Sequence, residues 1–172
     1  MSYILDAIDP VLEPAACHVG SCLFKAKMSV TRDLSEIMPY VNAKAKVVFY
    51  DTSEPVIVFK YAGCKVAMRA HELAAATVSH VAEARTALQA IVNFLNELWE
   101  QRETITPVAQ ERRRPPAIFI YKLLPKSNCG ECGEPTCLAF ATRLSLADKE
   151  LAECPKLSAE QAEELKKMLN EA

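Results

Sequence analysis

KVVFYDTSEPVIVFKYAGCKVAMR, residues 46–69, contains three β-rich runs separated by two short breaks. The runs cover 46–50, 55–61 and 64–69 and are rich in Val, Ile, Phe and Tyr, whereas the breaks, DTSE and AG, carry turn-forming residues. Runs of this kind joined by short polar or glycine-containing segments are typical of consecutive β-hairpins. The sequence therefore predicts an antiparallel meander of three to four strands.

The segments on either side of this stretch predict further elements. Apolar and polar residues alternate over about 22–30, which is the period-2 pattern of a half-buried strand. Asp33 and Glu36 have capping-box spacing and predict a short helix, which Pro39 should keep from extending. Residues 70–80, AHELAAATVSH, are expected to form a loop or a short helix.

A long amphipathic helix is predicted from residue 83 to about residue 102. Apolar residues recur there at three- and four-residue steps, and Glu97, Glu100 and Gln101 are left for solvent. The stripe consists of Ala84, Leu88, Ile91, Leu95, Leu98 and Trp99. Because such a stripe can cover one face of an antiparallel meander, we expect an α+β head.

The run QERRRPPA, residues 110–117, marks the predicted domain boundary. We expect an α+β head over 1–110 that binds a partner, an Arg/Pro linker over 111–118, and a small helical domain over 119–172. Within the last, Pro135 and Thr136 should begin one helix, and Ser158 with Gln161 should begin another.

Composition and charge exclude several classes of protein. The 172 residues carry a net charge of −2 and have a pI near 6.0, which does not favour a nucleic-acid partner. No apolar run approaches 18 residues and the N-terminus lacks a signal-peptide pattern, so we expect a cytoplasmic chain without membrane insertion. In a reducing compartment, seven cysteines are better explained as metal ligands or buried thiols than as disulfides.

Four of the cysteines follow the pattern C-x2-C-x4-C-x16-C: Cys129, Cys132, Cys137 and Cys154. Two of the chain's four glycines, Gly130 and Gly133, lie inside this loop, where a backbone wrapped around a cluster needs unusual φ angles and amide groups directed at sulfur. The spacing predicts a cluster pocket in which all four thiols are ligands.

The surroundings of these cysteines support metal binding. Cys137 should lie in the first turn of a helix, where the dipole favours the thiolate. Four thiolate ligands leave no open iron position, which favours electron transfer or structural stabilisation over Lewis-acid catalysis. Four cations close in sequence could offset the negative charge of the cluster and raise its potential: Lys122, Lys126, Arg143 and Lys156.

Other interpretations of the cysteines and histidines remain open. A four-cysteine zinc site needs the same thiolates, although zinc knuckles usually pair two short Cys-x2-Cys turns and this chain has one. Cys17 and Cys22 could form a second site with His18 or Cys64, or be incidental thiols. Two further histidines, His71 and His80, could carry protons but are more simply explained as packed or solvated.

LLPKSNCGECGEPTCLAFATRLSLADKELAECP, residues 123–155, resembles the four-cysteine 4Fe-4S domain found in the large subunit of corrinoid iron–sulfur proteins and in the B subunit of Rnf complexes. The resemblance covers about residues 119–156 and includes the leucine-proline lead, the NCGECGEPTC loop and the closing Cys154-Pro155. The chain as a whole is similar to small iron–sulfur proteins of anaerobes. The resemblance implies one 4Fe-4S cluster held by the four cysteines of the motif.

In that family the cluster domain passes single low-potential electrons, so the resemblance implies a carrier with a protein redox partner: a ferredoxin-like donor, an oxidoreductase or a corrinoid protein. The alternative is a non-redox interaction module in which a cluster or a zinc ion staples the small tail. No G-x-S-x-G, P-loop or H-E-x-x-H motif is present. We therefore expect no enzymatic role for the chain itself.

Overall fold

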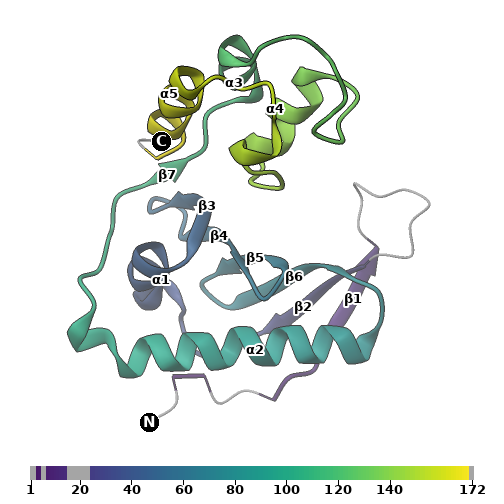
Figure 1. The fold of residues 1–172 in the computed structure, drawn as a ribbon. Helices are drawn as coiled ribbons and strands as arrows, with labels where there is room; N and C mark the ends of the chain where they lie inside the picture. The colour runs from purple at the N-terminus through teal and green to yellow at the C-terminus, as the bar shows by residue number, and fades with distance from the viewer. Residues whose placement is uncertain (1–2, 5–6, 15–23, 171–172) are drawn as a thin grey trace. The chain divides into compact units, whose positions relative to one another are not determined.

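The computed structural model describes residues 3–4, 7–14 and 24–170 and divides into two units, Met1–Arg112 and Arg113–Ala172. The first unit is built on an antiparallel sheet and the second is helical (Figure 1). The α+β class predicted from the sequence is therefore confirmed.

The sheet has the strand order β1-β2-β6-β5-β4-β3-β7, and its pairings from β1 to β3 are antiparallel. The strands β3, β4, β5 and β6 are consecutive both in sequence and in the sheet, so they form the predicted meander. The strand bounds are β1 Val11–Pro14, β2 Phe24–Ser29, β3 Lys46–Asp51, β4 Val56–Tyr61, β5 Cys64–Arg69, β6 Glu72–Val78 and β7 Arg112–Arg113.

The strand β6 corrects the expectation of a loop or short helix at 70–80. It runs between β2 and β5 and pairs with both, so its backbone groups are used in two ladders. Leu73, Ala74 and Ala75 are buried, as expected in the middle of a sheet. Alanine favours helices in isolation, but the pairing on both sides decides the conformation here.

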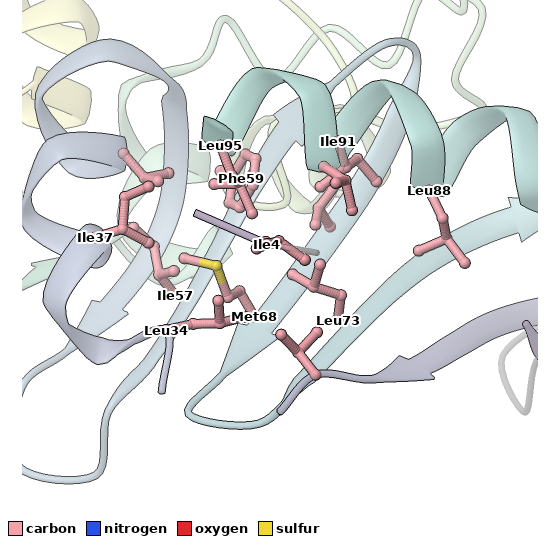
Figure 2. Close-up of a cluster of buried hydrophobic side chains, with 14 of the residues drawn as sticks. Ile4, Leu34, Ile37, Ile57, Phe59, Met68, Leu73, Leu88, Ile91 and Leu95 are labelled. Atoms are coloured by element: carbon pink, nitrogen blue, oxygen red, sulfur yellow. The ribbon is translucent and has the colours of Figure 1, made fainter. Parts of the chain in front are cut away.

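One face of this sheet is covered by helix α2, Val81–Glu100, which starts two residues before the predicted position. Figure 2 shows Leu88, Ile91 and Leu95 of α2 directed at side chains of β4, β5 and β6, including Phe59 and Met68. These residues are completely buried and belong to the core of the first unit.

The helix after Asp33 differs from the prediction in how it begins. A 3₁₀ turn, η1 (Ser35–Ile37), leads into α1 (Met38–Lys44), and Pro39 occupies the first turn of α1. Proline is tolerated there because the first backbone N–H groups of a helix have no intrahelical partner. Asp33 accepts a hydrogen bond from the Ser35 amide at 2.8 Å instead of forming a capping box with Glu36. A second 3₁₀ turn, η2 (Arg102–Thr104), follows α2.

The second unit consists of α3 (Ala117–Leu123), α4 (Cys137–Ser145), the 3₁₀ turn η3 (Leu151–Glu153) and α5 (Ala159–Asn170). Its core brings together Ile120 of α3, Phe140 of α4 and Leu165 of α5. Ser158 and Gln161 exchange two 3.2 Å hydrogen bonds, which is the capping box predicted for the last helix. The loop between α3 and α4 carries Cys129 and Cys132, and Cys137 is the first residue of α4.

Candidate metal centre

The loop before α4 is wound by residues with positive φ. Gly130 and Gly133 have φ angles of +74° and +82°, and the Gly133 amide donates to the Gly130 carbonyl at 2.9 Å. Asn128 is also left-handed, with φ +49°. Glycine adopts such angles without a steric penalty, so the two predicted glycine positions are where the chain turns most tightly.

Cys137 occupies the first position of α4, as the sequence predicted. Thr136 is the N-cap, and its hydroxyl accepts a hydrogen bond from the Ala139 amide at 3.1 Å. The Asn128 side-chain oxygen accepts from the Cys137 amide at 2.8 Å. The start of the loop is thereby tied to Cys137 at the N-terminus of α4.

Cys154 is presented by a separate arm of the chain. A capping box joins Glu150 and Glu153 across η3, and the Cys154 amide donates to Leu151 O at 3.1 Å. The segment that returns from α4 to Cys154 therefore contains a 3₁₀ turn. The backbone N–H of Lys156 donates a hydrogen bond to the Cys154 thiol. Amide donors of this kind are the groups that tune cluster sulfurs.

The pKa of the Cys154 thiol shows which groups surround it. Burial raises this pKa, the Lys156 amide lowers it, and the nearby thiols of Cys132, Cys137 and Cys129 raise it further. Cys132 and Cys154 also pack against the apolar cluster that contains the buried Cys137. The four predicted ligands thus lie in one neighbourhood.

The chemistry of the donor set bears on what this site could hold. In the described part of the chain, no group of three or more His, Cys, Asp or Glu side chains is placed so that it could hold a metal ion. The donors are nevertheless thiols beside an apolar cluster, with the Lys156 amide directed at the Cys154 sulfur, and these are the groups that iron–sulfur clusters use. The residues therefore fit a cluster, although the assignment of its ligands stays a prediction.

Of the four cations expected near the site, two contact carboxylates close to the ligands. Lys156 lies 3.2 Å from Glu131, and Arg143 lies 3.7 Å from both Glu134 and Asp148. Lys122 and Lys126 lie over aromatic rings of α3 instead, at 5.1 Å from Phe119 and 5.8 Å from Tyr121.

Sequence reasoning missed Lys149. Its ammonium group donates to the backbone carbonyl of Cys132 at 3.1 Å and to Glu153 at 2.6 Å. The hydrogen bond with Glu153 raises the pKa of Lys149, and nearby Glu134 and Cys132 add to this shift. The i, i+4 spacing of Lys149 and Glu153 immediately before Cys154 was the available signal.

The other predicted groups have different surroundings. Cys64 lies in β5 beside the core, and burial raises the pKa of its thiol. Cys17, Cys22 and His18 lie outside the described residues, so the second site stays a prediction. His80 is the N-cap of α2, where its Nδ1 accepts from the Glu83 amide at 3.1 Å.

Comparison with known proteins bears directly on this region. Residues 124–156 match the family described as "Putative Fe-S cluster". The second unit carries an iron–sulfur motif. The resemblance predicted from the NCGECGEPTC loop is confirmed.

Two kinds of curated protein are similar to part of this chain. The corrinoid/iron-sulfur protein large subunit of Moorella thermoacetica is 62% identical over 39 residues, which are 23% of this chain and 9% of that protein. The acetyl-CoA decarbonylase/synthase complex subunit gamma is 45% identical over 53 residues in Methanothermobacter thermautotrophicus, and 47% over 55 in Methanocaldococcus jannaschii. Those segments are 31% and 32% of this chain, and 12% and 11% of the relatives. No solved structure matches the chain.

These relatives correct one expectation. The sequence led us to expect no enzymatic role, but the relatives are named as subunits of the acetyl-CoA decarbonylase/synthase complex, which is an enzyme complex. The absence of hydrolase and nucleotide-binding motifs was a poor guide, because a redox subunit needs none of them. In the described part of the chain, no helix is both long and apolar enough to cross a membrane.

Proposed function

We propose that this chain binds one 4Fe-4S cluster through Cys129, Cys132, Cys137 and Cys154 and transfers single low-potential electrons to or from a larger oxidoreductase or corrinoid enzyme. The observation that carries the proposal is the gathering of these thiols around the buried N-terminus of α4. A bound cluster supplies a one-electron couple whose potential depends on hydrogen bonds to sulfur, nearby charge and solvent access.

The protein's own residues prepare this site in three ways. Cys137 lies at the N-terminus of α4, and the Lys156 amide partly offsets the burial that raises the pKa of the Cys154 thiol. Phe140 and Leu144 belong to the apolar cluster that contains Cys137 and against which Cys132 and Cys154 pack. Cys129 is exposed, so an electron could leave there over a short distance.

The relatives support a protein partner. They are named as subunits of a multi-protein complex and as a corrinoid/iron-sulfur protein, and the similarity covers 31% and 23% of this chain. We propose that residues 119–172 form the redox domain, that 111–118 link it to the head, and that the head, residues 1–110, selects the partner.

The chemistry of the head favours an acidic partner. On the sheet face opposite α2, the strand register places Lys25, Lys65, Lys60 and Lys46 in one row, with Ala76 between the first two and Glu13 paired with Lys25 at the end of the row. A neighbouring row on the same face consists of Lys27, Ala74, Ala67, Val58 and Phe49. A basic band beside small apolar residues is complementary to a carboxylate-rich protein surface, and it would speed the encounter.

The partner proposal is tested by reversing charge in the lysine row. Lys25→Glu with Lys65→Glu should slow electron transfer from an acidic ferredoxin at low salt by at least about tenfold, and the difference should shrink as salt is added. The control Lys44→Glu with Arg85→Glu makes the same change in net charge on the helices. Equal slowing by both pairs would refute a docking role for this face.

The alternative is that a cluster, or a zinc ion, only staples the small second unit. Its specific support is the size of that unit's core, which contains seven buried residues. The two functions differ in whether the bound cluster can be reduced and reoxidised. If the cluster of the anaerobically purified protein is reduced by dithionite and reoxidised by a partner enzyme, the carrier is supported. A cluster that cannot be reduced would support the structural role instead.

A further inference from the structure

The predicted ligands come from two segments of the chain, the ligand loop before α4 and the closing arm that carries Cys154. Cys129 and Cys132 lie in the loop that leads to Cys137, the first residue of α4, and Cys154 directly follows η3. A cluster binds all four only if the loop and the closing arm keep a fixed separation.

Lys149 makes the most direct connection. It belongs to the closing arm, and its ammonium group donates to the carbonyl of Cys132, inside the loop, at 3.1 Å. The same group contacts Glu153, next to Cys154, at 2.6 Å. A Cβ added to Gly133 would lie 3.7 Å from this ammonium group, so the loop passes close to it.

Glu153 is itself held in place. One of its carboxylate oxygens accepts from the Glu150 amide at 2.8 Å, and the other accepts from Lys149. Both oxygens are thus used, and the lysine is attached to a fixed turn. A charge-assisted hydrogen bond to a carbonyl of the ligand loop is stronger than one between neutral groups.

The other two cations that reach the loop make weaker contacts. Lys156 and Glu131 are 3.2 Å apart, but their side chains are 52% and 47% exposed, as in an ordinary surface ion pair. Arg143 lies 3.7 Å from Glu134 and is 49% exposed. The side chain of Lys149 is only 24% exposed, and it binds backbone rather than a movable carboxylate.

We propose that Lys149 is the positioning residue of the cluster site: it ties the ligand loop to the closing arm, and its charge raises the reduction potential. The inference rests on the proposed function. It assigns two separable effects to one side chain, because holding the arms depends on its hydrogen bonds and tuning the potential depends on its charge.

Two substitutions separate these effects. Lys149→Met keeps the length of the side chain but removes the donors and the charge. The connection between the two arms should therefore weaken, and the reduction potential should fall. Glu153→Gln still offers an oxygen to the Glu150 amide but weakens the contact with Lys149. Because this substitution removes a negative charge, it should raise the reduction potential. It should also weaken the connection between the two arms.

The experiment loads each variant of the full chain anaerobically, then measures the rate of iron loss to a chelator and the midpoint potential. Lys149→Met should lose iron about tenfold faster, the loss expected for a hydrogen bond to a charged group. Its equilibrium constant for reduction should fall by about tenfold, which is about 59 mV for one electron. Glu153→Gln should lose iron roughly threefold faster with a potential above that of the wild type.

Lys166→Met is the control, since it removes a cation of the same unit from an exposed ion pair with Glu163. Its iron should be lost at nearly the wild-type rate. Equal effects of Lys149→Met and Lys166→Met, or slower iron loss from Glu153→Gln, would overturn the positioning role. If Lys149→Met cannot be loaded, Glu153→Gln and Lys166→Met still decide it. A wild-type chain that holds no cluster would instead refute the proposed function.

Discussion

The two units of this chain bury very different amounts of apolar surface. The first unit has 25 buried residues in one cluster beneath its sheet, whereas the second has seven. One of those seven is Cys137, and Cys132 and Cys154 pack against them. The first unit can be stable through packing alone, while the second uses the proposed metal ligands as part of its core. From this difference we expect cluster binding and folding to be coupled in the second unit and not in the first.

Removing the cluster should have the largest effect, and this effect should differ between the two units. Because the second unit has so small a core, its amides should lose protection from hydrogen exchange when iron is chelated, while those of β2 to β6 and α2 keep theirs. Cys137→Ser should give the same pattern. Cys64→Ser in β5 is the control and should leave both units protected. Uniform loss of protection across the chain would show that the comparison is wrong.

Truncating one buried phenylalanine in each unit should sharpen the comparison. Phe59 and Phe140 are 0% and 1% exposed, so replacing either by alanine should cost about 3–5 kcal/mol of unfolding free energy. Phe59→Ala should lower the thermal midpoint of the first unit and leave the cluster absorption unchanged. Phe140→Ala should reduce the iron retained per chain. Calorimetry measures the thermal midpoint, and visible absorption measures the bound cluster. Loss of iron from Phe59→Ala, or full iron retention by Phe140→Ala, would contradict the account.

Two glycines with similar backbone angles provide a smaller test. Gly133 and Gly63 have φ +82° and +78°, so alanine at either position should cost roughly 1–2 kcal/mol. Gly133→Ala should lower cluster occupancy, because the strain lies in the ligand loop next to Lys149. Gly63→Ala, in the turn between β4 and β5, should lower only the stability of the first unit to urea. A loss of iron from Gly63→Ala would argue against independent units.

The helix cap at Thr136 should give the smallest effect. Thr136→Ala removes the acceptor for the Ala139 amide, which should cost about 1 kcal/mol and speed chelation of iron by about fivefold. Thr136→Ser keeps the hydroxyl and should behave like the wild type in the same chelation assay. Equal rates for alanine and serine would mean that the cap does not support Cys137.

The elements that the sequence predicted correctly are those with a strong local pattern. The β-rich runs of residues 46–69 became three strands, and the apolar stripe from Ala84 to Leu98 became the buried face of α2. The start of α4 at Cys137 and the Ser158 capping box were also correct. In each case the local preference and the tertiary contacts favour the same conformation.

The errors arose where tertiary contacts decide. The alanines of β6 carry no strand pattern and become extended because β2 and β5 pair with them on both sides. Pro39 was expected to limit its helix but lies in the first turn, where its missing N–H costs nothing. Lys149 has no distinctive spacing to Cys132, and only the folded loop brings its ammonium group to that carbonyl.

The most direct test of the central claim is a joint assay of iron and acid-labile sulfide in protein prepared without oxygen, for the wild type and Cys154→Ser. The account predicts about four irons and about four sulfides per wild-type chain, and substantially less of both in the variant. Zinc without sulfide in the wild type, or full loading of Cys154→Ser, would contradict it.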